Sequence, residues 1–169
     1  GYNQYTTLIS PISSLFGTYA TAITTMGTDA YIGIYSGDPI TFYNPWRNIS
    51  TNTIAFNVVN KNLLGQKDSF LVKYNSAVNY IWSIQLTTGS TGVYPLFTTQ
   101  DNTNIYGFCR SLNKTLNIIN ASGVTAPSIF NNGIGDIFCC LFQASPTGGI
   151  GWSTQITSPV GGNIDNSSG

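Results

Sequence analysis

The sequence predicts an all-β protein, built as a single β-sandwich or jelly-roll-like domain with an N-terminal arm or a short N-terminal helix. From Tyr31 onward, short apolar and aromatic runs rich in Val, Ile, Thr, Tyr and Phe alternate with polar turn segments. Strands prefer these residue types. The segments between them, such as Thr88–Gly92 and Asn131–Gly133, carry the glycine and Asn-Gly chemistry of tight turns. Short strands and turns at this spacing are typical of a sandwich.

The pattern predicts strands throughout the central part of the chain. They are Ala30–Tyr35, Thr53–Val59, Ser69–Tyr74, Tyr80–Leu86, Val93–Phe97, Ile105–Leu112, Thr115–Ile119, Asp136–Gln143 and Gly151–Thr157. No internal repeat and no linker divides the 169 residues. We therefore expect an N-terminal segment over 1–28, one sandwich domain over 29–158 and a flexible C-terminal tail over 159–169.

The N-terminal segment has two interpretations. Apolar residues recur there at helical spacing: Ile12, Leu15, Phe16, Tyr19, Ile23 and Met26. Ser10 followed by Pro11 resembles a helix start, which predicts an amphipathic helix over Ser10–Met26. Gly17 and the many threonines disfavour a helix. The alternative is an extended arm over Tyr5–Phe16 that pairs outside its own domain. Its alternate apolar residues then share one face: Leu8, Ile12 and Phe16.

The composition excludes several function classes. Only 7% of the residues are charged, against roughly 25% in an average protein. The six acidic residues are all Asp, histidine is absent, and the net charge is zero. A basic nucleic-acid face needs clustered Lys and Arg, so no nucleic-acid partner is expected. Without histidine there is no Ser-His or Cys-His pair and no imidazole metal site. The sequence therefore predicts a non-enzymatic protein with no catalytic residues, metal or cofactor.

Two motifs come closest to a binding site. Asp101–Asn104 offers alternating oxygens as at the start of a calcium loop, but it lacks the later Gly and Glu and is expected to be a turn. Trp46, Trp82 and Trp152 are candidates for a sugar-stacking platform. Trp82 lies within an apolar run and is expected to be buried. Trp46 follows Asn44-Pro45 in an expected loop and is the best exposed candidate.

Several features indicate a secreted protein. The polar start Gly1–Tyr5 has no initiator Met, as after removal of a signal peptide. No run of about 18 apolar residues is present, so no membrane-spanning segment is expected. The N-x-[ST] sequons lie at Asn48, Asn113, Asn120 and Asn166. Such sequons also arise by chance in a chain rich in Asn, Ser and Thr. If they are used, the protein carries N-linked glycans at the cell surface.

The three cysteines predict one disulfide. Cys109 and the pair Cys139-Cys140 lie in separate apolar runs that are both expected to be strands. Adjacent strand residues point to opposite faces, so only one of the pair can meet Cys109 in the core. Such a bond would contribute roughly 3 kcal/mol by closing a loop of about thirty residues. The alternative is a set of buried free thiols, and a leftover thiol can also pair between subunits.

The scarcity of charge has a consequence for the sheet edges. Soluble β proteins protect their edge strands with charged residues and proline, and most strands expected here contain no charge. An N-terminal arm from a neighbouring subunit can complete such a sheet by β-augmentation. Head-to-tail donation does not close on itself, so it produces a filament of identical subunits.

A polar N-terminus, a Thr/Ser/Asn-rich β domain, several sequons and very little charge together resemble archaeal extracellular filament subunits of the thread and bundling-pilus kinds. This resemblance covers the layout of the whole chain and no specific motif. It implies jelly-roll-like subunits joined by N-terminal donor strands, with N-glycans on thread subunits. The sequence therefore leads us to expect a structural subunit of a cell-surface filament. A viral coat or spike protein and a secreted carbohydrate-binding module are the alternatives.

Overall fold

Strands make up most of the chain in the computed structural model, which describes residues 9–11, 17–48, 53–89, 92–111, 113, 115–130 and 138–156 and contains no helix among them. The strands are β1 (Ile9–Pro11), β2 (Thr18–Met26), β3 (Asp29–Ser36), β4 (Ile40–Asn48), β5 (Thr53–Lys61), β6 (Asp68–Tyr74), β7 (Tyr80–Thr87), β8 (Val93–Gln100), β9 (Ile105–Ser111), β10 (Thr115–Ile119), β11 (Ile129–Phe130), β12 (Phe138–Ala144) and β13 (Ile150–Ile156).

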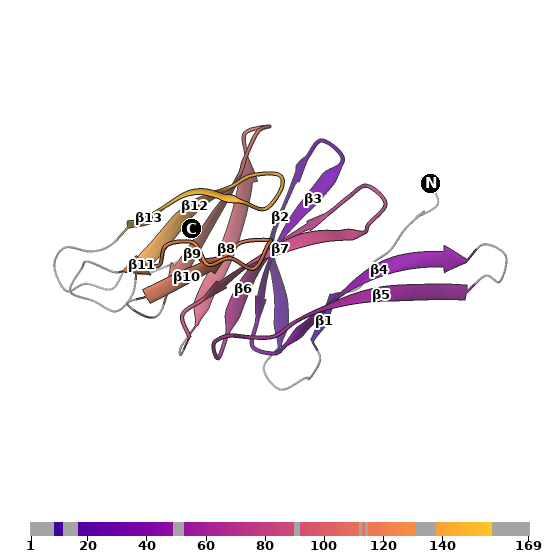
Figure 1. The fold of residues 1–169 in the computed structure, drawn as a ribbon, viewed down its shortest axis with the longest axis horizontal. Coiled ribbons are helices and arrows are strands. Elements are labelled where there is room, and N and C mark those ends of the chain that lie inside the picture. Colours follow the sequence, from indigo (N-terminus) through magenta and orange to yellow (C-terminus); the bar gives the residue numbers. More distant parts are fainter. Residues whose placement is uncertain are drawn as a thin grey trace.

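The predicted fold class is confirmed, because two antiparallel sheets pack as a sandwich (Figure 1). The six-stranded sheet has the order β11-β10-β7-β6-β3-β2, and the four-stranded sheet has the order β13-β12-β9-β8. Between them lies the first core cluster, which both sheets supply. Its largest members include Tyr31, Leu71, Trp82, Ile84, Phe138 and Phe142. Burial of apolar side chains between the sheets is the main force that holds the sandwich together.

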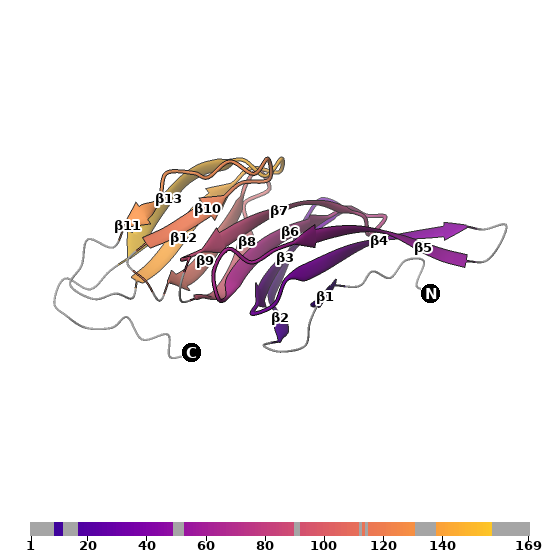
Figure 2. The same ribbon diagram turned by 60° about the horizontal axis from the view of Figure 1, so that its bottom comes forward.

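A third layer covers the other face of the six-stranded sheet. It is the small sheet β1-β4-β5, and it closes a second core cluster of Ile34, Ile40, Phe42, Phe70, Val72 and Tyr74. Covering on both faces explains why nearly every residue of β6 is buried instead of every second one. The β4–β5 hairpin continues beyond this contact and projects away from the sandwich (Figures 1 and 2).

All nine strands that the sequence predicts are present, with ends shifted by a few residues. The helix expected over Ser10–Met26 is wrong, because Thr18–Met26 is β2 and pairs with β3 along its length. Its β-branched threonines suit a strand, and cross-strand pairing outweighs a chance helical spacing. The loop expected at Trp46 is also wrong. Its backbone belongs to β4, which pairs with β5 from Ile40 to Asn48.

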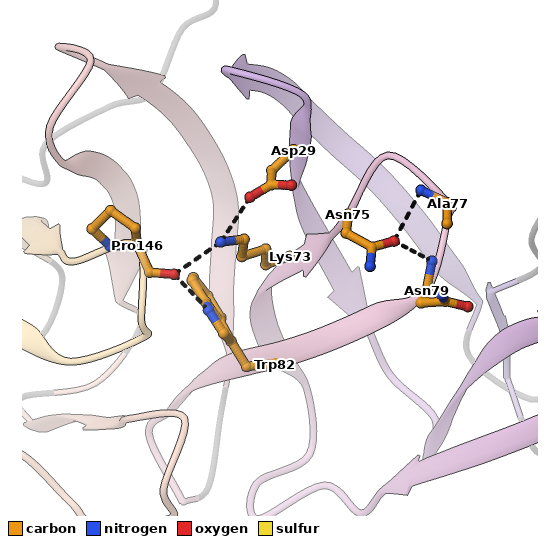
Figure 3. Close-up of polar contacts among 7 residues, drawn as sticks. All are labelled: Asp29, Lys73, Asn75, Ala77, Asn79, Trp82 and Pro146. Atoms are coloured by element: carbon orange, nitrogen blue, oxygen red, sulfur yellow. Dashed lines mark hydrogen bonds and ion pairs between the residues drawn. The ribbon is translucent and has the colours of Figure 1, made fainter.

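A polar junction ties the two main sheets together at one end (Figure 3). Lys73 on β6 forms an ion pair with Asp29 on β3, at 2.8 Å between Nζ and Oδ2. The Lys73 ammonium also donates to the carbonyl oxygen of Pro146, which lies in the β12–β13 turn, at 3.1 Å. The indole N–H of Trp82 donates to the same carbonyl at 2.9 Å. A side chain from each of two neighbouring strands therefore holds the turn of the opposite sheet.

The ionisation of Lys73 follows from this junction. Partial burial by itself lowers the pKa of Lys73, because it disfavours the charged form. The hydrogen bond to Asp29, the proximity of Tyr31 and the charge of Asp29 act in the opposite direction and prevail, so the pKa of Lys73 is raised above its ordinary value. The neighbouring turn is independently closed by Asn75, whose side-chain oxygen accepts from the backbone N–H groups of Ala77 and Asn79, as Figure 3 shows.

Candidate assembly interface

The N-terminal strand β1 lies on the β4 edge of the third layer. The register pairs Ile9 with Phe42, Ser10 with Thr41 and Pro11 with Ile40, in antiparallel orientation. Ile9 packs against the second core cluster, of which its partner Phe42 is a fully buried member. Pro11 has no N–H to donate, which reduces the hydrogen bonding of an already short ladder. In the single chain, β1 therefore contributes a small, separable part of the cover of the second core.

Gly17, directly before β2, is held by two hydrogen bonds to the segment after β3. Its N–H donates to the Oδ2 atom of Asp38 at 3.1 Å, and its carbonyl accepts from the N–H of Gly37 at 3.1 Å. Asp38 is only 2% exposed, so this contact lies inside the domain. Gly17 has a φ of 78°, a conformation that glycine adopts without steric cost. These hydrogen bonds, called the Gly17–Asp38 clasp here, position the start of β2.

Two sheet edges carry no charged residue and no proline. β2 is an edge of the six-stranded sheet, and β13 is an edge of the four-stranded sheet. Among the described residues, neither strand has a second hydrogen-bonded neighbour. Tyr19 and Ile23 on β2 are 60% and 68% exposed, and Ile156 on β13 is 51% exposed. Long uncharged edges of this kind are templates for pairing with another chain.

The residues predicted to form the donated face, Leu8, Ile12 and Phe16, lie outside the described residues. Ile9, which the sequence interpretation did not single out, is the residue of this segment that packs on the core. The signal in the sequence is an apolar residue directly before Ser10-Pro11, inside the stretch for which an extended arm is one of the two interpretations. The role of this segment as a donated arm stays a prediction.

The sequons occupy different surroundings. Asn120 follows β10, and its Oδ1 atom accepts from the N–H groups of Ser122 and Val124 and from the Ser122 hydroxyl. Asn113 is half-buried and follows β9, where its backbone forms hydrogen bonds with the Ser111 hydroxyl. Asn48 is the last residue of β4, with its side chain outside the described part. Asn166 lies outside the described residues altogether. Glycosylation of all four stays a prediction.

The register of β9 and β12 distinguishes the two candidate partners of Cys109. Cys140 lies directly opposite Cys109, and both side chains belong to the first core cluster. Cys139 points to the other face, in register with Arg110. All three are free thiols in this structure, so the disulfide stays a prediction. The hydrogen bond to Cys140, together with burial, raises the pKa of the Cys109 thiol well above its ordinary value, which disfavours the reactive thiolate.

The motifs considered for binding differ in exposure, and the side chain of Trp46 lies outside the described residues. Trp82 is buried, as expected, at 6% exposure, whereas Trp152 is 42% exposed. Asp101 forms a turn, because its Oδ1 atom accepts from the backbone N–H groups of Thr103 and Asn104 at 2.9 and 2.8 Å. In the described part of the chain, no three His, Cys, Asp or Glu side chains are grouped as metal ligands would be.

Comparisons with protein-family models, with curated proteins and with solved structures find no match. Within the described residues, no helix has the length and apolar character needed to cross a membrane.

Proposed function

We propose that this protein is a structural subunit of an extracellular cell-surface filament, a pilus or thread, that polymerises head to tail by donating its N-terminal strand to a neighbouring copy. The observation that carries the proposal is the position of β1. A three-residue strand pairs at the β4 edge, and Ile9 packs on the second core cluster. The same strand supplied by a neighbour would make the same contacts.

Such an exchange has a small energetic cost. Replacing the chain's own β1 by that of another copy breaks and re-forms identical contacts, which is the reason that swapping of an element is a low-cost route to assembly. The ladder has only three paired positions, so opening it costs little compared with the whole sandwich. The Gly17–Asp38 clasp keeps β2 in place while the segment before it changes partner. Because donor and acceptor surfaces differ, each subunit offers one of each and the chain of subunits grows.

The uncharged edges of β2 and β13 support side-by-side association of the filaments that strand donation produces. The archaeal thread or bundling-pilus type is the nearest expectation, and it rests on the resemblance described above. In this proposal the subunit is an exported glycoprotein without enzymatic activity. Its N-glycans lie at Asn48, Asn113, Asn120 and Asn166, and they supply solubility that the nearly uncharged surface lacks.

Deletion of residues 1–16 tests strand donation directly. We expect the truncated protein to keep its β-sheet circular dichroism, because the clasp begins at Gly17, and to remain monomeric in sedimentation and electron microscopy while the full chain forms filaments. Addition of a peptide of residues 1–16 is expected to occupy the β4 edge and cap growth. Unchanged filaments after the deletion would refute donation.

A matched pair of substitutions separates the arm from a general effect of charge. Ile9→Asp places a carboxylate against the second core cluster and is expected to block assembly, since burying an unpaired charge is unfavourable. Val124→Asp places the same charge at a position that is 60% exposed and is expected to have no effect. Closed shells in the micrographs would instead favour a viral coat protein, and a monomer that binds glycans without assembling would favour a carbohydrate-binding module.

A further inference from the structure

An aromatic pair stands on the outer face of the four-stranded sheet. Tyr106 on β9 is in register with Gln143 on β12, and Gln143 is in register with Trp152 on β13. Strands lie about 4.8 Å apart, so the first and third strands of this row are separated by roughly 10 Å. The two ring centroids are only 6.1 Å apart, at an interplanar angle of 45°. The rings therefore lean toward each other across the position of Gln143.

A local irregularity makes room for this arrangement. The β12–β13 register shifts between Gln143 and Ala144, with Trp152 and Ile150 as their partners, so Gly151 is the extra residue. A Cβ atom at Gly151 would lie 2.4 Å from the Oε1 atom of Gln143, closer than any real contact. A β-bulge is a common device for re-aiming a neighbouring side chain. Here the glycine leaves space for the Gln143 amide against the β13 backbone, and the indole of the following residue, Trp152, is 42% exposed.

A fixed carboxylate borders the pair. The Tyr106 hydroxyl donates to the Oδ2 atom of Asp101 at 2.6 Å. The other carboxylate oxygen accepts from the backbone N–H groups of Thr103 and Asn104. These hydrogen bonds, that of Tyr106 first, lower the pKa of Asp101, and the bond to Asp101 raises the pKa of Tyr106. At neutral pH the site therefore holds an ionised, oriented carboxylate and a protonated phenol, both facing water.

We propose that this row, defined by Asp101, Tyr106, Gln143 and Trp152, is a binding site for a neutral saccharide. The C–H face of a pyranose ring packs on the exposed indole of Trp152. The sugar hydroxyls form hydrogen bonds with the Gln143 amide and the Asp101 carboxylate. A sugar presents both an apolar face and a rim of hydroxyl donors, and the row offers the complement of both.

The charges and polar groups of the row select this occupant. The ionised Asp101 repels anionic ligands, and no Lys or Arg belongs to the row to compensate for that charge. A purely apolar partner surface would take Asp101 and the Gln143 amide out of water without replacing their hydrogen bonds, which is unfavourable. Hydroxyl groups replace those bonds, and bonds to a carboxylate are the stronger ones. The site does not involve β1 or the second core cluster, so it is independent of the proposed strand exchange.

Titration of the full chain with a panel of neutral oligosaccharides, namely mannotriose, cellotetraose and chitotriose, tests the site. We expect saturable binding of at least one of them by isothermal titration calorimetry, with a change in tryptophan fluorescence. Trp152→Ala is expected to weaken binding by about tenfold or more, since an exposed aromatic anchor is removed. Tyr106→Phe, which loses the hydroxyl bonded to Asp101, is expected to weaken it by a few-fold.

Ile156→Ala is the matched control, because Ile156 is also exposed on β13 but lies outside the row. Its binding is expected to equal that of the unaltered chain, and circular dichroism confirms that each variant is folded. No binding of any member of the panel at millimolar concentration would overturn the proposal. Binding that survives Trp152→Ala would also overturn it. Loss of filaments in Trp152→Ala without any saccharide binding would assign the row to contacts between copies of the chain and reject the sugar site.

Discussion

Substitution of Phe42 by alanine tests whether the third layer is packed on the six-stranded sheet as the structure has it. The Phe42 side chain is fully buried. Its ring stacks on Tyr80 at 5.1 Å and meets Phe70 edge-on at 6.2 Å between centroids. Removal of a buried phenylalanine costs about 3–5 kcal/mol through lost transfer energy and the cavity left behind. Because two rigid aromatic rings line this cavity and limit its collapse, we expect a loss in the upper half of that range.

Guanidinium chloride unfolding measures this loss, with the fluorescence of the buried Trp82 and far-UV circular dichroism as two probes. With a slope of about 4 kcal/mol per M, a loss of about 4 kcal/mol lowers the midpoint by roughly 1 M. Ile81→Ala on β7 is the control, because Ile81 is 45% exposed and its loss is expected to stay within about 0.5 kcal/mol. A loss below about 1 kcal/mol for Phe42→Ala would refute the packing of the third layer.

Two further predictions concern the Lys73 junction and the facing thiols. Lys73→Met is expected to lower the free energy of unfolding by about 1 kcal/mol at pH 7. Because the pKa of Lys73 is raised in the folded state, the difference between the variant and the unaltered chain should persist up to about pH 10.5 and vanish above it. Denaturant midpoints of both proteins, measured from pH 7 to 11.5, test this expectation. A pH-independent difference would contradict the assigned ion pair. Oxidation is expected to join Cys109 to Cys140, identified by peptide mapping under non-reducing conditions, and a bond to Cys139 instead would contradict the β9–β12 register.

Much of the fold follows from local pattern. The runs Ser69–Tyr74 and Ile105–Leu112 predict strands because they are rich in β-branched and aromatic residues and turn residues follow them at short intervals. Local pattern gives the wrong prediction at Ile40–Asn48, where Asn44-Pro45 favours a loop. That segment is a strand because β5 pairs with it throughout and because Ile40 and Phe42 enter the second core. Neither the pairing with β5 nor the packing on the second core can be inferred from the sequence of Ile40–Asn48 alone.

The N-terminal segment shows the same limit. The spacing from Ile12 to Met26 fits a helix, yet Thr18–Met26 forms nine residues of strand against β3. Helix propensity is a weak preference that cross-strand packing overrides. The sequence allows an extended arm as the alternative, but the contact of Ile9 with the second core depends on how β4 folds over the sheet.

For the candidate sites, the composition of the chain limits which chemistry is available, whereas the packing of the sheets sets which residues meet. Absence of histidine and scarcity of charge are properties of composition, so the sequence predicts uncharged sheet edges whatever the strand order. Only strand register could choose Cys140 over Cys139 as the residue opposite Cys109. Only register, together with a bulge at Gly151, could bring Tyr106 and Trp152 together from distant parts of the chain. Register depends on the packing of whole sheets, and no local stretch of sequence encodes it alone.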